Sequence, residues 1–136
     1  MAEPSLVANW SSRSPYLQSV LRIVAALMFT SAGTTILFAF PVGMPNGATV
    51  PPMSQIWIGG VLELVGGLLL LLGLFTRPTA FILSGMMAVA YFQFHFPHGF
   101  WPTMNNGVPA VLYCFLWLYF SAAGAGPWSL DAKRGK

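Results

Sequence analysis

A single carboxylate interrupts a long apolar run of this chain, and glycine pairs flank it on both sides. The run reads GGVLELVGG, with Glu63 at its centre. Residues three and four positions apart lie on the same face of a helix, so the acid and the glycines are expected to share one face. Such a face lets neighbouring helices approach closely in a membrane. The expected packing residues are Gly59, Gly60, Gly66 and Gly67, with Gly73 near the edge of the face.

Glu63 is costly to place in an apolar environment, which argues that it has a purpose. Two roles stay open at this point. The carboxyl group either clasps two helices through a hydrogen bond, or it binds a ligand or handles a proton. It is either ionised beside a cation or protonated and engaged in a neutral hydrogen bond.

His95 is the second residue that could do chemistry. At about 1.5 Å of rise per residue, Glu63 and His95 lie roughly 20 and 25 Å above the turn at Arg77, and therefore at similar depth. His95 shares a helical stripe with Tyr91, so a carboxylate, a phenol and an imidazole could meet in an outward-opening polar site. The alternative is that His95 only marks the membrane interface at the end of its helix.

Arg22 lies about 9 Å into the first apolar stretch by the same rise. It either extends to the cytoplasmic surface or reaches towards Glu63. Asn105 and Asn106 precede a glycine and indicate a turn, which either caps the next helix or roofs the outer pocket with amides. No catalytic constellation or strong metal spacing is present, and His95 with His98 fits no metal signature.

Aromatic residues crowd the outer end of the predicted bundle, close to His95. An aromatic collar over a carboxylate and an imidazole would hold a flat ligand such as a quinone ring. The alternative is an interfacial belt. No other cofactor is indicated. The aromatic residues are Tyr91, Phe92, Phe94, Phe96, Phe100 and Trp101.

Composition defines the elements that must position these groups. The 136 residues are 56% hydrophobic and 7% charged, whereas soluble domains carry about 25% charged residues. Apolar stretches at about 16–40, 55–75, 78–96 and 108–123 are long enough to cross a bilayer as helices. We predict an all-α membrane protein, a single four-helix transmembrane domain over 1–136, with tails at 1–15 and 127–136. Leu6, Val7 and Trp10 either lie along the headgroups or belong to a disordered tail.

Charge predicts the orientation of this bundle. The basic residues all fall on one side of the four spans, which makes that side and both termini cytoplasmic. They are too few and too scattered for a nucleic-acid surface, and Cys114 has no partner for an intramolecular disulfide. Trp117 lies deep enough to be a packing residue. The basic residues are Arg13, Arg22, Arg77, Lys133, Arg134 and Lys136.

From Leu21 to Asp131 the chain resembles the DoxX family of small bacterial membrane proteins. The resemblance rests on Leu62-Glu63, GLFTRP at 73–78, MAVAY at 87–91, His95, FWP at 100–102, NNG at 105–107 and GPWSLD at 126–131. It implies a multi-pass, four-helix protein of the bacterial inner membrane, loosely associated with quinone-linked sulfur oxidation and redox complexes. The chain departs from the family pattern at Ala32, Ile36 and Val108, where many members carry His, Lys and Glu.

These departures favour a non-catalytic or accessory subunit of a redox or quinone-linked complex, and an enzyme is not favoured. The expected partners are the lipid bilayer and other membrane subunits or a second copy of the chain. Two alternatives remain. One is a bundle that binds a quinone or lipid-like molecule around Glu63 and His95. The other is an oxidoreductase component that takes electrons from a partner.

Overall fold

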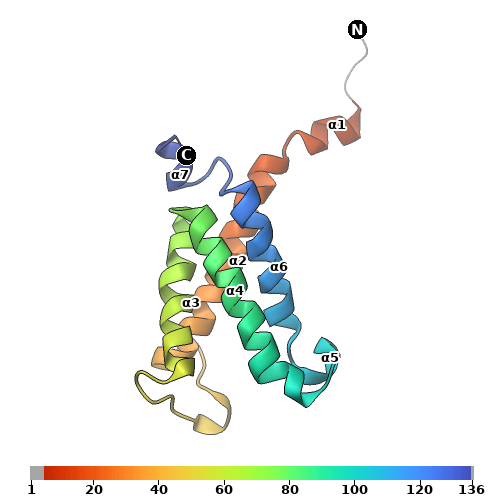
Figure 1. Cartoon of the computed structure of the whole chain (residues 1–136). Coiled ribbons are helices and arrows are strands. Elements are labelled where there is room, and N and C mark those ends of the chain that lie inside the picture. The colour runs from red at the N-terminus through yellow and green to blue at the C-terminus, as the bar shows by residue number, and fades with distance from the viewer. Residues whose placement is uncertain (1–4, 136) are drawn as a thin grey trace.

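The computed structural model describes residues 5–135, and the regular secondary structure within that range is helical. Four longer helices, α2, α3, α4 and α6, form the bundle, with chain reversals between them (Figure 1). The elements are α1 (Leu6–Ser11), α2 (Ser14–Phe38), the 3-10 turn η1 (Pro45–Gly47), α3 (Gln55–Leu72), α4 (Thr76–Ala90), the π-helical η2 (Tyr91–His95), the 3-10 turn η3 (Phe96–His98), α5 (Pro102–Asn105), α6 (Val108–Ala123) and α7 (Leu130–Lys133).

The helix limits follow the predicted apolar stretches to within a few residues. Helix α2 ends where Ala39 adopts a left-handed conformation with φ 55°. Helix α3 ends at Gly73 in the same region, with φ 68°, which glycine adopts without a steric penalty. Helix α4 begins at Thr76, before Pro78, because proline is compatible with the first turn of a helix. The range of α6 is the predicted one.

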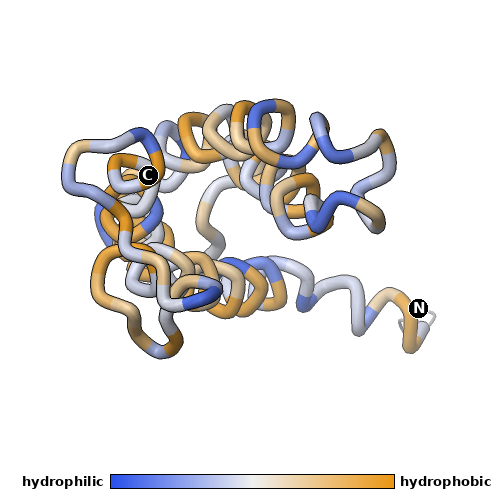
Figure 2. Tube along the Cα trace, turned by 90° about the horizontal axis from the view of Figure 1, so that it is seen from below, coloured by the Kyte–Doolittle hydropathy of each residue, from blue (hydrophilic) through white to orange (hydrophobic). Residues whose placement is uncertain are grey.

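Three helical stretches are long and apolar enough to cross a membrane: α2, α3 and the continuous stretch Thr76–His98. Helix α6 is apolar but has 16 residues, and it falls below that length. Large apolar side chains cover the outside of the bundle, as in Leu27 at 58% exposure and Phe81 at 64%. Figure 2 looks along the bundle and shows hydrophobic residues on its outside. Such a surface suits lipid and not water.

Helices α2 and α3 make backbone contact through glycine. A Cβ atom on Gly33 of α2 would lie 2.8 Å from the carbonyl oxygen of Gly60 and 3.1 Å from the Cβ of Glu63. A Cβ on Gly67 would lie 3.1 Å from the backbone of Thr30. This close approach fixes the position of Glu63 relative to α2.

The other glycines of α3 correct the prediction of one shared groove. Gly66 faces Leu83 of α4, whereas Gly60 and Gly67 face α2, so the glycines of α3 are divided between two neighbouring helices. No atom of the described residues lies within 4 Å of a Cβ built on Gly59. Gly73 ends the helix and does not belong to the helix-packing face. Glu63 lies on the ridge between the two contact surfaces.

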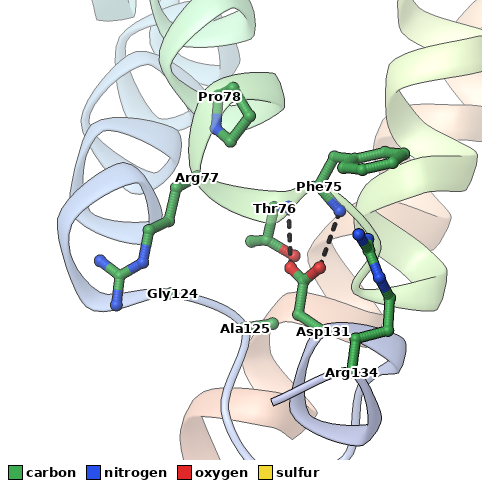
Figure 3. A pocket seen from close by; sticks show the side chains of 8 residues that line it. All are labelled: Phe75, Thr76, Arg77, Pro78, Gly124, Ala125, Asp131 and Arg134. Atoms are coloured by element: carbon green, nitrogen blue, oxygen red, sulfur yellow. Dashed lines mark hydrogen bonds between the residues drawn. The ribbon is translucent and has the colours of Figure 1, made fainter. Parts of the chain in front are cut away.

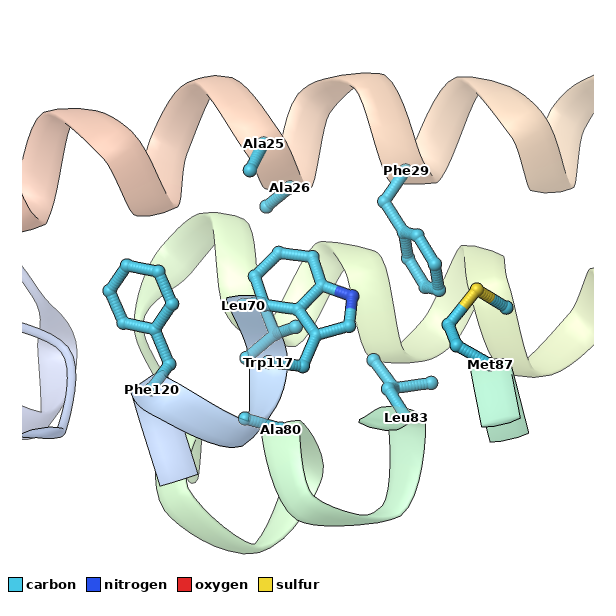
Figure 4. Close-up of a cluster of buried hydrophobic side chains, with 9 residues drawn as sticks. All are labelled: Ala25, Ala26, Phe29, Leu70, Ala80, Leu83, Met87, Trp117 and Phe120. Atoms are coloured by element: carbon cyan, nitrogen blue, oxygen red, sulfur yellow. The ribbon is translucent and has the colours of Figure 1, made fainter. Parts of the chain in front are cut away.

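A cluster of apolar side chains around Trp117 holds the four bundle helices together. Trp117 is fully buried, as predicted, and its ring makes an edge contact with Phe29 at 5.5 Å between centroids. Leu70, Leu83 and Phe120 pack around the same indole (Figure 4). Helix pairs α2–α3 and α4–α6 are closely packed, while α3 and α4 contact each other less extensively. The bundle therefore consists of two tight pairs with a looser seam between them.

The N-terminal helix lies outside this bundle. Helix α1 projects away from α2, and Leu6, Val7 and Trp10 on it are exposed (Figure 1). Its start is capped by Ser5, whose side chain accepts a hydrogen bond from the backbone of Ala8 at 3.0 Å. The segment around these three residues is thus helical, and the predicted contact with headgroups remains a prediction.

We expect Gly33→Ala to destabilise the bundle by about 1–3 kcal/mol, because the new methyl group would meet backbone atoms that cannot move independently. Gly85→Ala is the matched control, since that position in α4 has no atom of the described residues within 4 Å. Unfolding of both variants in detergent micelles measures the difference. Equal stability of the two variants would contradict close backbone contact between α2 and α3.

Candidate functional site

A cavity of about 470 Å³ lies in the seam between α3 and α4. It occupies the end of the bundle where α3 begins and α4 ends. Its size falls within the range of small-molecule sites, about 300–1,000 Å³. Most of its wall is apolar, and three polar side chains, Gln55, Glu63 and His95, line it. The apolar lining includes Ile36, Ile58, Leu62, Met86, Met87 and Val89.

Glu63 is the acidic residue that lines this cavity. Its Oε2 atom is buried and has no hydrogen-bond partner among residues 5–135. The structure therefore shows no helix-to-helix clasp through this oxygen. An unpaired buried polar atom costs roughly 1–3 kcal/mol, more when it is charged. Glu63 is thus the group in the cavity with the greatest need of a donor.

His95 lines the same cavity from the π-helical segment η2, so the structure brings the two predicted residues together. Its Nδ1 atom lies 3.0 Å from the carbonyl oxygen of Asn105. A carbonyl can only accept, so Nδ1 carries a proton, and in the neutral ring Nε2 is an acceptor. The π-helical geometry is frequent at functional sites, because it shifts the register of side chains along a helix.

Tyr91 turns away from Glu63. Its hydroxyl donates to the carbonyl oxygen of Phe100 at 2.8 Å and accepts from Nδ2 of Asn105 at 3.2 Å. Asn105 is buried, and its Oδ1 accepts from the backbone of Gly107 at 2.9 Å. Tyr91, His95 and Asn105 therefore tie the end of α4 to the segment before α6.

Asn106 has a structural place next to this network. It adopts a left-handed conformation with φ 61° and closes the turn between α5 and α6. Its side chain is exposed, and it does not line the cavity. Of the two amides expected either to cap a helix or to roof the pocket, Asn105 acts as a structural network residue and Asn106 as a turn residue.

Three residues of the site region were not predicted from the sequence. Gln55 and Gln93 exchange a pair of amide hydrogen bonds, at 2.7 and 2.8 Å, across the edge of the seam. Tyr113 of α6 lies within electrostatic reach of Glu63 and stacks on Trp117. The four-residue spacing of Tyr113 and Trp117 places both on one helix face. Since Trp117 is predicted to pack inside the bundle, this spacing could have identified Tyr113 as well.

Arg22 lies at the opposite end of the bundle. It neither extends to the surface nor reaches towards Glu63, the two roles that the sequence leaves open. Its side chain is 1% exposed, so it does not extend into solvent. Its Nε donates to the carbonyl oxygen of Leu70 at 2.8 Å, and its Nη2 donates to that of Trp128 at 2.7 Å. Its Nη1 donates to the carbonyl oxygen of Ala125. The guanidinium therefore binds backbone carbonyls and not Glu63.

Residues 124–131, which we call the C-terminal clasp, fold back over this end of the bundle and are not a free tail. Ser19 of α2 donates to the carbonyl oxygen of Ala125 at 3.2 Å and accepts from the backbone of Trp128 at 3.1 Å. Gln18 donates to the carbonyl oxygen of Gly124 at 2.7 Å. These contacts attach the clasp to α2.

Asp131 attaches the clasp to α4. Its two carboxylate oxygens accept from the backbone N–H groups of Phe75 and Thr76, each at 2.9 Å (Figure 3). These donors lie at the N-terminus of α4, where a negative charge is favoured. Burial acts to raise the pKa of Asp131, but hydrogen bonds from Thr76 and Phe75 and the charge of Arg134 outweigh it and lower the pKa below its usual value.

A family model described as DoxX matches residues 17–96. A protein of Haemophilus influenzae, described as an uncharacterized protein, is 47% identical over 130 residues, which is 92% of this chain and 96% of that relative. No solved structure matches the chain.

We expect Asp131→Asn to lower stability by about 1 kcal/mol at neutral pH, because it removes a charged helix cap. The lowered pKa means that the stabilisation is present above the unfolded pKa of about 3.9 and is lost as pH falls through the folded value. The stability gap between parent and variant, measured by unfolding in detergent, should therefore close at acidic pH. A gap that stays constant down to pH 2 would contradict the role of the Asp131 charge.

Proposed function

Because the chain belongs to the DoxX family of membrane proteins, we propose that it is an accessory protein of the bacterial inner membrane that holds a quinone or lipid-like molecule in the seam between α3 and α4. The ligand has an apolar body and a polar head. The body lies along the apolar wall, and the head meets Glu63 and His95.

The observation that carries this proposal is that Glu63, whose buried Oε2 has no partner among residues 5–135, lines a mostly apolar cavity. A ligand that donates a hydrogen bond there removes the cost of the orphaned acceptor. Ile58, Leu62 and Val89 line the cavity and are also on the exposed outside of the helices, so a ligand can enter sideways from the bilayer.

The proposed topology has four spans with both termini in the cytoplasm. Helix α6 at 16 residues is about 24 Å long, slightly less than the hydrocarbon core of about 30 Å. It packs against α4 along its length, and a short span of this kind is accommodated by local thinning of the bilayer. The exposed basic side chains Arg77, Lys133 and Arg134 gather at one end of the bundle, which supports assigning that end to the cytoplasm.

The accessory role follows from the chemistry of the groups that face the cavity. A carboxyl group, an imidazole and an amide can bind a ligand and move protons, but they do not carry electrons. Redox chemistry on a bound quinone would therefore need electrons from a partner subunit. If the chain is instead a component of an oxidoreductase, it needs the same partner as its source of electrons.

We expect Glu63→Gln to weaken retention of a reduced short-chain quinone, decylubiquinol, at least tenfold, because its ring hydroxyl donates to the carboxylate and hydrogen bonds to a charged group contribute about 1.5–3 kcal/mol. Tyr91→Phe is the matched control, because it removes a polar atom that is bonded to Phe100 outside the cavity. Native mass spectrometry of the detergent-solubilised protein measures the bound probe. Equal retention by parent and Glu63→Gln would refute the binding site.

Purification in mild detergent tests the accessory role separately. We expect other membrane subunits to copurify with the chain, and quinone reduction to require them. A preparation that contains this chain alone and still reduces quinone with a soluble electron donor would contradict the accessory role while leaving the binding site in place.

A further inference from the structure

A second cavity, of about 260 Å³, lies at the end of the bundle that carries the C-terminal clasp. It is lined by the start of α4 and by the chain after α6, and it is separate from the seam that holds Glu63. Three charged side chains line it: Arg77, Asp131 and Arg134 (Figure 3). The proposed ligand site in the seam does not use any of these residues.

The two arginines are held in place by the fold. Arg77 donates to the carbonyl oxygen of Ala122 at the end of α6. Its guanidinium occupies space that a side chain on Gly124 would fill, since a Cβ there would lie 3.0 Å from Nη2. The guanidinium of Arg134 lies 4.8 Å from the centre of the Phe75 ring, a cation–π contact. Both side chains are exposed on the solvent side and retain free N–H donors.

The charges of the cavity do not cancel. Asp131 is already engaged by the N–H groups of Phe75 and Thr76, so the start of α4 offers no further anion site through them. Two guanidinium groups against one carboxylate leave a net charge of one positive unit on the lining. This charge complements a single phosphodiester, and guanidinium groups bind phosphate oxygens in a bidentate manner.

The position of the cavity favours the membrane as the source of such a phosphodiester. Leu72 and Phe75 beside it are 52% and 51% exposed, and they belong to the apolar surface that faces lipid. A phosphate held by Arg77 and Arg134 would therefore have an acyl-chain surface directly next to it. The topology proposed above places this end of the bundle on the cytoplasmic side. Basic pockets between transmembrane helices on that side bind anionic lipid headgroups.

We propose that Arg77 and Arg134 bind the phosphodiester of an anionic phospholipid in this cavity. The bound lipid lies between α4 and the C-terminal clasp. Its headgroup contacts the two arginines, and its chains run along Leu72 and Phe75.

Native mass spectrometry of the full chain tests this proposal, with dioleoyl phosphatidylglycerol and dioleoyl phosphatidylcholine offered together. We expect the parent to retain phosphatidylglycerol preferentially. Arg77→Gln with Arg134→Gln should weaken retention about thirtyfold, because each arginine near a lipid headgroup contributes about fivefold. Arg13→Gln with Lys133→Gln is the matched control, since it removes the same charge from exposed residues that do not line the cavity.

Three results would overturn the proposal: equal loss in the control pair, equal binding of phosphatidylcholine, or complete displacement of the lipid by 10 mM inorganic phosphate. The last result would show a site for free phosphate. If the double variant does not fold, Arg134→Gln alone should still fold, because Arg134 is an exposed residue that follows α7. It should weaken retention about fivefold, the contribution of one arginine. Arg77→Lys with Arg134→Lys should bind the lipid more tightly than the glutamine pair but less tightly than the parent, because it keeps the charges and loses the bidentate donors. Retention no better than that of the glutamine pair would count against charge recognition.

Discussion

The buried guanidinium of Arg22 is the interaction on which one end of this bundle depends. A charge in an apolar environment is tolerated only when its donors are satisfied. The carbonyl oxygens of Leu70, Ala125 and Trp128 supply the partners, and they belong to the end of α3 and to the C-terminal clasp. Carbonyl groups at helix ends lack intrahelical partners and carry partial negative charge. One cation thus joins the end of α3 to the clasp.

Asp131 completes the same arrangement with the opposite charge. Its carboxylate caps the N-terminus of α4, next to the place where Arg22 binds the C-terminal carbonyls of α3. The backbone of Asp131 also donates to the carbonyl oxygen of Gly73, at 2.8 Å, within the turn that joins these two helices. The α3–α4 turn is therefore fixed from both sides. The segment at 126–131 thus has a structural role in the bundle although it lies beyond the last bundle helix.

The sequence predicted the helices well because continuous apolar runs depend on local composition. The residues 108–123 of α6 are an example. The pairing of Glu63 with His95 in one cavity could also be predicted, since depth follows from helical rise. The target of Arg22 could not be, because its carbonyl partners at Ala125 and Trp128 lie 103 and 106 residues further along the chain. The division of the α3 glycines between α2 and α4 depends on how the helices are arranged around α3, which periodicity alone does not define.

The two ends of the seam between α3 and α4 have opposite character, and this contrast bears on function. At one end Arg22, Asp131 and the clasp close the seam with satisfied hydrogen bonds. At the other end the helices enclose a cavity, and the Oε2 of Glu63 stays without a partner among the described residues. Close packing at Gly33 prevents α3 from rotating to relieve this atom. The backbone contact that stabilises the bundle therefore also keeps Glu63 in the wall of the cavity, which is the basis of the ligand site that we propose there.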